Sequence, residues 1–600
     1  MCGIIGYHGD QDALPIIQTG LQNLEYRGYD SAGVALHNGD ISIEKCSGEV
    51  DELVQACPPS SEATCGIGHT RWSTHGLPTD ANAHPHTDCT REVAVVHNGI
   101  IENYDALKAD LADHEFTSET DTEVIPHLLE ERLAAGDDPV DALTAVTDRL
   151  EGSYAVCATV EGYDGVYAAR DDSPLVLGHG DDGTYLASDV TAFLEYTDQV
   201  TYLEDGDVAV IRDAVTLYRD GDRVDPPTET IEWEADAAEK SGYDHYMLKE
   251  IHEQPDALRQ TIAGRIDQQA GTVDLDLDLP QEYLQSIEEI QIVACGTSNY
   301  AGEYAARLLG EFADVRTSVS IASEYAFDSG SDPWRTLTIA VTQSGETADT
   351  LSALRAANQA GARTLAVTNT LGSTVTREAD DSVFIRAGPE IGVAATKTFA
   401  SQVATLALVA VHIGRQRGTL TADQASTVLG NLQQLPGAVQ QVLDDEAAVQ
   451  SVAEEYADHD AFFFVGRQLG YPVALEGALK LKEISYDHAE GFASGELKHG
   501  PLALVTERTP VLATLTAGTE PEDTLNNVKE AQARGAPVIG ASSMPDDEKY
   551  LDARFTVPDV GRVAPLVANV YWQLFAYHVA ALKDRPIDKP RNLAKSVTVE

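Results

Sequence analysis

The chain opens with Met1-Cys2-Gly3-Ile4-Ile5-Gly6-Tyr7, and this stretch decides how the first third of the sequence is interpreted. If Met1 is removed, Cys2 becomes the first residue and carries both a nucleophile and a base. Its own α-amine, with a reference pKa of about 7.7–8.0, can take the thiol proton. The apolar residues after Gly3 predict a buried strand that holds this terminus. An ordinary start codon followed by a small residue would give the same sequence, so a catalytic role for Cys2 depends on motifs elsewhere in the chain.

The first 235 residues are rich in short, alternating apolar runs that predict β-strands, as at 31–36, 93–97, 154–158 and 208–211. Two helices are expected near 103–112 and 122–135, the second capped by Asp121 or Thr120. Strands in blocks with helices between them indicate sheets layered with helices.

Three polar clusters follow strands or turns in this part. Arg71, beside Trp72, could clamp a carboxylate with two hydrogen bonds, or simply stack on the tryptophan at the surface. Asn98-Gly99 offers a side-chain amide and a backbone N–H to an oxyanion, but Asn-Gly after a strand is also a common hairpin turn. Asp121 either caps a helix or binds an amine.

Together these features resemble the class II glutamine amidotransferase domain, an N-terminal-nucleophile hydrolase. The ordered motifs that carry the resemblance are Cys2-Gly3-Ile4-Ile5-Gly6, Arg27-Gly28-Tyr29-Asp30-Ser31-Ala32-Gly33, His69-Thr70-Arg71-Trp72, His97-Asn98-Gly99-Ile100-Ile101-Glu102-Asn103 and Ser118-Glu119-Thr120-Asp121-Thr122-Glu123.

The resemblance implies a role for each matched residue. Cys2 attacks the γ-amide of glutamine, and Asn98 and Gly99 hold the oxyanion. Arg71 binds the α-carboxylate and Asp121 the α-amine, while Trp72 is the gate residue at the ammonia exit.

A change in pattern marks a domain boundary after the strand-rich part. We expect an amidotransferase domain at 1–225 and a partly helical linker at 226–284. A strand–Gly–helix–strand–loop–helix–strand pattern then occurs twice, at 285–430 and 450–589, and is typical of doubly wound α/β domains. A tail, 590–600, ends the chain. The predicted fold class is an α+β sandwich followed by two α/β doubly wound domains.

The first repeat carries two polar loops that can wrap a phosphate with hydroxyls, backbone N–H groups and a helix N-terminus. Plain helix capping is the alternative. The candidate phosphate-binding residues are Thr297, Ser298, Thr342, Gln343, Ser344 and Thr347. The second repeat has lost most of these groups.

Glu476, Lys480 and Glu483 have a spacing that places them on one face of a predicted helix. A solvated stripe of ion pairs is the alternative interpretation. The Gly-rich stretch 491–501, which contains His499, follows it and favours a catalytic site. Isomerising a sugar needs a base and a ring-opening acid or base, and a carboxylate and a histidine fit these roles.

The repeats resemble the sugar isomerase (SIS) domain, and the whole chain resembles the glucosamine-6-phosphate synthase family. That resemblance implies transfer of ammonia from glutamine to fructose 6-phosphate, giving glucosamine 6-phosphate and glutamate in a homodimer without metal or cofactor. It implies that Lys595 forms a Schiff base with the open-chain sugar. Glu483 then moves a proton between C1 and C2, and His499, often from the neighbouring subunit, opens the ring. Glu476 and Lys480 support them.

Two other functions fit parts of the chain. Another class II amidotransferase, such as an amidophosphoribosyltransferase, would lack the repeated α/β domains. A non-enzymatic phosphosugar-binding regulator would have no reason to combine Cys2, Asn98, Glu483 and Lys595. The hypothesis of a glucosamine-6-phosphate synthase therefore accounts for more of the chain than either of these two alternatives.

Composition indicates the cellular compartment of the protein and argues against some kinds of binding site. No apolar run approaches the roughly 20 residues of a membrane-spanning helix, and the N-terminus lacks a signal-peptide pattern, so we expect a cytoplasmic protein. The seven cysteines are scattered and contain no C-x-x-C pair, which argues against a disulfide framework or a zinc site. His84-Pro85-His86 has no third ligand nearby in the sequence, so it is not expected to bind a metal.

The net charge predicts salt dependence. The chain has 98 Asp and Glu against 40 Lys and Arg, a formal charge of −58 that repels nucleic acid and anionic lipid. At molar salt the Debye length falls to about 3 Å, which screens self-repulsion. We expect the melting temperature to rise as KCl is increased from dilute buffer to molar concentration. A protein that is stable in dilute buffer and unfolds in molar KCl would contradict this halophilic interpretation.

Overall fold

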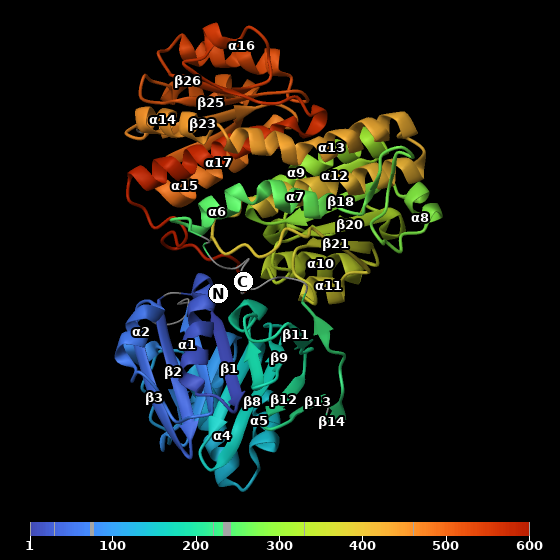
Figure 1. Ribbon diagram of the computed structural model, residues 1–600. Coiled ribbons are helices and arrows are strands. Elements are labelled where there is room, and N and C mark those ends of the chain that lie inside the picture. The colour runs from blue at the N-terminus through green and yellow to red at the C-terminus, as the bar shows by residue number, and fades with distance from the viewer. Residues whose placement is uncertain are drawn as a thin grey trace. The chain divides into compact units, whose positions relative to one another are not determined.

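The computed structural model describes residues 2–28, 30–71, 77–219, 221–231, 240, 242–328, 330–459 and 461–598. The chain divides into two compact units (Figure 1). The first contains Met1–Ala238 together with the tail Ala594–Glu600, and the second contains Glu239–Leu593.

The first unit is built on two antiparallel sheets. The first sheet has the strand order β15-β11-β9-β10-β1-β4-β2-β3, and the second has the order β14-β13-β12-β8-β7-β6-β5. Their bounds are β1 Gly3–Gly9, β2 Ser31–Asn38, β3 Asp40–Ser47, β4 Cys65–Arg71, β5 His86–Thr87, β6 Val93–Ile101, β7 Gly152–Val160, β8 Tyr163–Asp171, β9 Val176–Gly180, β10 Gly183–Ala187, β11 Gln199–Tyr202, β12 Asp207–Ile211, β13 Val215–Arg219, β14 Asp222–Val224 and β15 Glu229–Thr230.

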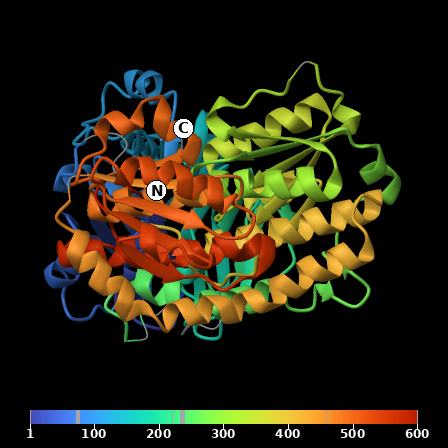
Figure 2. The same ribbon diagram turned by 90° about the horizontal axis from the view of Figure 1, so that it is seen from above.

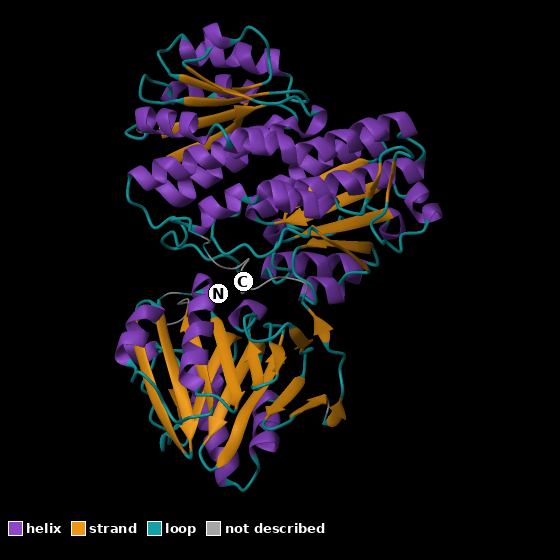
Figure 3. Ribbon diagram, viewed as in Figure 1, coloured by secondary structure: helices purple, strands orange, loops and turns teal. Residues whose placement is uncertain are grey.

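Alternating side chains give this unit four layers, two sheets with helices outside them. Figure 3 shows that strands make up most of this unit. Ile4 of β1 and Val96 of β6 belong to one apolar cluster between the two sheets. Ile5 of β1 packs on the other face with α1 (Ala13–Leu24) and α2 (Val50–Ala56). Val95 of β6 packs outward against α4 (Val124–Ala134) and α5 (Pro139–Thr147). Each sheet is thus covered by helices on its outer face.

The predicted helices are present, but the capping expected at the second one is wrong. They are α3 (Tyr104–Asp110) and α4, which is preceded by a short 3-10 helix, η3 (Asp121–Glu123). Asp121 does not cap η3 or α4, because its Oδ2 accepts the backbone N–H of Ile101 at 2.8 Å. Thr120, in the cap position of η3, makes no side-chain capping bond.

The second unit contains two parallel sheets, each in a doubly wound order. The orders are β19-β18-β20-β21-β22 and β24-β23-β25-β26-β27. In each, the connections reverse direction between two central strands, β18 and β20 in the first sheet and β23 and β25 in the second. Ligands in such folds bind at the carboxyl ends of the strands beside this switch point. The bounds are β18 Glu289–Ala294, β19 Arg316–Ile321, β20 Thr336–Val341, β21 Arg363–Thr368, β22 Asp381–Phe384, β23 Ala461–Gly466, β24 His488–Ala493, β25 Val511–Leu515, β26 Val538–Ser542 and β27 Ala553–Thr556.

One apolar core is shared by the two halves of this unit. Ile292 of β18 and Phe464 of β23 belong to the same cluster, which long helices between the sheets complete (Figures 1 and 2). The outer faces are covered separately, by α10 on the first sheet and by α16 on the second. The helices are α6 Tyr246–His252, α7 Gln254–Ile262, α8 Gln281–Ser286, α9 Gly296–Ala313, α10 Ala348–Ala360, α11 Thr374–Glu378, α12 Lys397–Arg417, α13 Ala422–Leu443, α14 Glu446–Tyr456, α15 Gly470–Ser485, α16 Pro521–Gln532 and α17 Ala564–Leu582.

Within the described ranges, no helix is both long enough and apolar enough to cross a membrane.

Candidate active sites

Cys2 lies directly before β1, and its carbonyl is held from two sides. Asn98 Nδ2 and Arg27 Nε each donate to the Cys2 carbonyl oxygen at 3.1 Å. Arg27 is buried and also pairs with Asp189, whose Oδ2 lies 3.2 Å from its guanidinium. The residue that follows the thiol is fixed as well, because Gly3 pairs with Thr70 in the sheet. These contacts hold the position of the Cys2 backbone.

Asn98 and Gly99 lie inside β6, so the hairpin-turn alternative is excluded. Gly99 has φ +123°, and a Cβ atom there would come within 2.0 Å of the Ser153 carbonyl oxygen. Only glycine fits this position without strain. One amide proton of Asn98 is used by the Cys2 carbonyl, which leaves its second amide proton as a donor beside Cys2.

His69 fixes the orientation of the Asn98 amide. Burial lowers the pKa of His69 to about 3, with the neighbouring Arg71 as a second cause, so the ring is neutral. Its Nε2 faces two acceptors, the His97 carbonyl at 3.0 Å and Asn98 Oδ1 at 3.1 Å. Nε2 must therefore carry the proton, and Asn98 turns its oxygen to His69 and its NH₂ group to Cys2.

Arg71 ends β4 and is only 3% exposed. Burial lowers its pKa, while the nearby Cys2, Asp30 and Asp121 act in the opposite direction. The predicted carboxylate binder and amine binder thus lie within electrostatic reach of each other and of Cys2. Trp72, the predicted gate residue, lies outside the described residues.

No role was predicted for Arg27 or His69, although both lie within the quoted motifs. The available signal for Arg27 was its place in a Gly-containing motif of a chain that is poor in basic residues. No sequence signal indicated the tautomer of His69, because it depends on two acceptors from β6.

In the second unit, Glu476, Lys480 and Glu483 lie on one face of α15, as predicted. Lys480 Nζ is 2.6 Å from Glu483 Oε2 and 3.5 Å from Glu476 Oε1. Glu476 is 0% and Lys480 1% exposed, so the solvated-stripe alternative is excluded. Burial raises the pKa of Glu476 to about 7 against the opposing effect of Lys480. The two carboxylates outweigh burial and raise the pKa of Lys480, which keeps it cationic.

This ion-pair cluster connects the two repeats. Thr297 Oγ1, in the first turn of α9, donates to Glu476 Oε2 at 3.0 Å and lies 3.2 Å from Lys480 Nζ. The next residue, Ser298, is bonded through its Oγ to Gln402 Nε2 at 2.9 Å, a partner that the sequence did not indicate. The helix face of the second repeat therefore meets the first polar loop of the first repeat.

The two predicted phosphate loops begin side by side. Ala294, the last residue of β18, pairs with Val341, the last residue of β20, so the loops after them start at the same level of the sheet. Thr342 Oγ1 lies 3.1 Å from Thr347 Oγ1 and accepts the Gly345 N–H at 3.2 Å.

Thr347 occupies the cap position of α10 but makes no side-chain capping bond. This disfavours capping by Thr347, and anion binding at this helix N-terminus stays a prediction. Gln343 and Ser344 lie between these two threonines in the same loop.

The remaining two predicted residues are placed elsewhere. His499 ends a 3-10 helix, η8 (Ser494–His499), and its side chain is exposed. Among the described residues, no hydrogen bond or ion pair joins it to Glu476, Lys480 or Glu483. Lys595 lies in the tail that belongs to the first unit.

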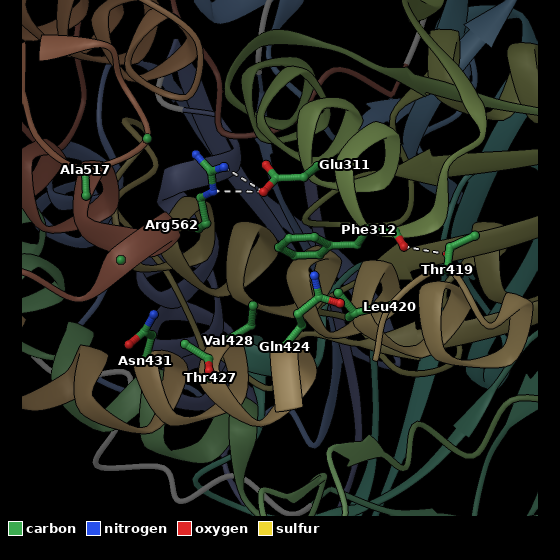
Figure 4. Close-up of a pocket in the computed structure, with 12 residues that line it drawn as sticks. Glu311, Phe312, Thr419, Leu420, Gln424, Thr427, Val428, Asn431, Ala517 and Arg562 are labelled. Carbon is green, nitrogen blue, oxygen red and sulfur yellow. Dashed lines mark hydrogen bonds and ion pairs between the residues drawn. The ribbon is translucent and has the colours of Figure 1, made fainter. Parts of the chain in front are cut away.

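A separate pocket lies between α9 and α13, and Figure 4 shows the residues that line it. Its charged residues, Arg562 and Glu311, neutralise each other through hydrogen bonds of 3.1 and 2.6 Å. The pocket contains none of the predicted catalytic residues.

Removal of the buried cation should be costly. We expect Lys480→Met to lower the free energy of unfolding by about 3–5 kcal/mol, because it leaves two carboxylates in the interior without a cation. Guanidinium chloride denaturation followed by tryptophan fluorescence measures it, since Trp572 is buried in α17 of the same unit. Lys482→Met, an exposed position on α15, is the matched control. Equal midpoints for the two variants would contradict the prediction.

Comparison with known proteins supports both halves of this description. The sequence matches the SIS domain family at residues 283–412 and 455–583, and a glutamine amidotransferase domain family at 69–195. A protein of Halobacterium salinarum named glutamine–fructose-6-phosphate aminotransferase [isomerizing] is 61% identical, with 100% of each chain covered. The chain belongs to the glutamine–fructose-6-phosphate aminotransferase (isomerizing) family.

Other members agree along their whole length. The aminotransferases of Methanosarcina mazei and Thermus thermophilus are each 46% identical, again over 100% of both chains. The solved C-terminal domain of the Francisella tularensis aminotransferase is 38% identical, with a TM-score of 0.55, and covers 59% of this chain and 100% of its own. The predicted family, fold class and enzyme class are confirmed.

Proposed function

We propose that this protein transfers the amide nitrogen of glutamine to fructose 6-phosphate and isomerises the product to glucosamine 6-phosphate, releasing glutamate. The proposal is carried by one observation: full-length similarity to this aminotransferase family in a chain that retains both polar centres. Glutamine hydrolysis belongs to the first unit. Sugar chemistry belongs to the second unit and to Lys595 of the C-terminal tail. No metal or cofactor is needed for either step.

At the first centre, the thiol of Cys2 attacks the γ-amide carbon once Met1 has been removed. The α-amine takes the thiol proton and passes it to the departing ammonia, and water then hydrolyses the thioester to glutamate. Asn98 and Gly99 stabilise the negative oxygen, and the contact between Asn98 and the Cys2 carbonyl supports this role. Arg71 and Asp121 bind the two α-substituents of glutamine.

At the second centre, the loops after β18 and β20 hold the phosphate of fructose 6-phosphate through Ser298, Ser344 and Thr347. Lys595 forms an imine with the open-chain ketose, and Glu483 moves the proton between C1 and C2. Lys480 supports Glu483 as its permanent cationic partner, 2.6 Å away. Glu483 must accept and return a proton during the reaction. A partner that stays charged near neutral pH, as Lys480 does, keeps the electrostatic surroundings of Glu483 constant meanwhile.

The coupled assay tests this function directly. Glutamine is incubated in molar KCl with and without fructose 6-phosphate, and glutamate and glucosamine 6-phosphate are measured. We expect equal amounts of both products, with strong stimulation of glutamate release by the sugar. Glutamate without amino sugar would mean that another molecule is the acceptor. No glutamate, in a chain shown by mass spectrometry to lack Met1, would refute the proposal.

We also propose that the protein is a cytoplasmic homodimer in which His499 acts in the partner's sugar site. Its exposure and its lack of contact with Glu483 within one chain support the dimer. The need for a reduced Cys2 thiol supports a reducing compartment.

Mixing His499→Ala chains with Glu483→Gln chains tests the shared site. We expect about one quarter of wild-type synthesis, because half of randomly mixed dimers are mixed and each has one intact site of two. Re-mixing each variant with itself is the control. No recovery in a dimer shown by sedimentation to exchange would place His499 in its own chain's site.

A further inference from the structure

Four side chains that suit a metal ion meet in the first unit, away from Cys2. Cys89 lies in the turn between β5 and β6, His114 follows α3, and His127 and Glu130 are one turn apart on α4. Each offers one ligand atom, and these four atoms all lie within 4.8 Å of one another. None of these residues takes part in the proposed chemistry.

Four of the six distances between these atoms are close to the edges of a zinc coordination tetrahedron. With Zn–S near 2.3 Å and Zn–N and Zn–O near 2.1 Å, a tetrahedron has S···N edges of about 3.6 Å and N···O edges of about 3.4 Å. Cys89 Sγ lies 3.5 Å from His114 Nδ1 and 3.6 Å from His127 Nδ1. Glu130 Oε2 lies 3.0 and 3.4 Å from the same two nitrogens.

A hydrogen-bonded cluster without metal explains this arrangement less well. Without a metal, two arrangements are open. Either both Nδ1 atoms donate to Glu130 Oε2, which already accepts the Cys89 N–H at 3.2 Å, or an Nδ1 that accepts the Cys89 S–H turns its lone pair toward that oxygen. A carboxylate oxygen offers two lone pairs, so three donors are too many. A Zn²⁺ ion at the centre would instead bind a thiolate, a carboxylate and two neutral imidazoles, for a net charge of zero.

The surroundings hold the histidines as metal ligands are usually held. His127 is 1% exposed, and its ring packs edge-on against Phe116 at 4.7 Å between centroids. The second ring nitrogen of His114 lies 3.5 Å from the carboxylate of Glu131. Carboxylates placed behind a ligating histidine fix its orientation and increase its basicity.

We propose that one Zn²⁺ ion binds at this place through Cys89, His114, His127 and Glu130. The ion joins the β5–β6 turn, the segment after α3 and helix α4. The segment after α3 leads into the loop that carries Asp121. The same loop is also held by Glu123, whose carboxylate accepts the backbone N–H groups of Thr117 and Ser118, both at 2.7 Å. The ion is structural, because all four of its positions are filled by protein.

A zinc site was not expected from the sequence, because the sequence lacks a C-x-x-C pair. The four residues come from three segments, and only His127 and Glu130 have a ligand-like spacing. The fold, and not the local sequence, brings them together.

The test measures metal in the full-length protein. We expect about one zinc per chain by mass spectrometry of the intact holoprotein, in line with a closed four-ligand site. Replacing zinc by Co²⁺ should give the visible bands of tetrahedral cobalt and a near-ultraviolet thiolate-to-cobalt band. Chelation should lower the melting temperature of the first unit.

Cys89→Ser is the test variant, because its side chain is exposed and the change is small. It should lose the thiolate-to-cobalt band and most of the zinc, and chelation should no longer change its melting temperature. Cys46→Ser, a half-buried thiol in β3, is the control and should keep all three properties. A wild-type protein with less than one-tenth of a zinc per chain, or cobalt spectra identical in wild type and Cys89→Ser, would overturn the proposal.

Discussion

Cys2→Ala is expected to abolish glutamate release, with a loss of about 10⁴-fold or more, as found when a catalytic nucleophile is deleted. The reason is that the Cys2 thiol is the proposed nucleophile, and the Asn98 amide holds its position by donating to the Cys2 carbonyl at 3.1 Å. Conversion of fructose 6-phosphate to glucose 6-phosphate should continue, because proton transfer between C1 and C2 takes place in the other unit. Chromatography of both sugar phosphates, alongside a glutamate assay, measures the two activities in one sample.

Cys57→Ser serves as the matched control, since it replaces a half-buried thiol of the same unit that lies just after α2. It should keep both activities. If Cys2→Ala retained more than about one-hundredth of the glutaminase rate, the nucleophile would have to be another group.

Lys595→Ala should lose the sugar chemistry and keep glutamine hydrolysis, the reverse of Cys2→Ala. Without the imine, synthesis is expected to fall by about 10³-fold or more, while basal glutamine hydrolysis continues. Lys595→Arg keeps the charge but cannot form an imine, so it should fail equally. An active Lys595→Arg variant would reduce the lysine to an electrostatic role.

Borohydride provides a direct readout of the same step. Reduction of the imine in the presence of fructose 6-phosphate should attach the sugar covalently to the wild-type chain, and the peptide mass should place it on Lys595. The Lys595→Ala chain should remain unlabelled under the same conditions. Labelling of a different lysine in the wild type would contradict the assignment.

Much of the architecture followed from short-range patterns. The strand periodicities separated an antiparallel sandwich from two parallel sheets, and the spacing of Glu476, Lys480 and Glu483 placed them on one helix face. Such features depend only on neighbours along the chain, which is why the sequence reveals them.

Features that depend on distant partners were not predictable. Helix capping was one of the two roles open to Asp121, but its carboxylate accepts the backbone N–H of Ile101, from a strand of the sandwich, instead. Burial of Glu476 and Lys480 likewise depends on the first repeat, through Thr297. Local preferences such as helix capping do not determine the contacts of a buried polar group when the tertiary structure places another hydrogen-bond partner beside it.

The shared core of the second unit has a consequence for synthesis on the ribosome. Domains generally fold in the order in which they are made, and the sandwich can close long before the second unit is complete. The first parallel sheet has no such independence, because α17 (Ala564–Leu582) and β18 supply the same apolar cluster. The nascent chain must therefore carry an unfinished half, with apolar surface exposed, until its last helix emerges. A pause in translation before residue 564 would leave the chain most prone to aggregation.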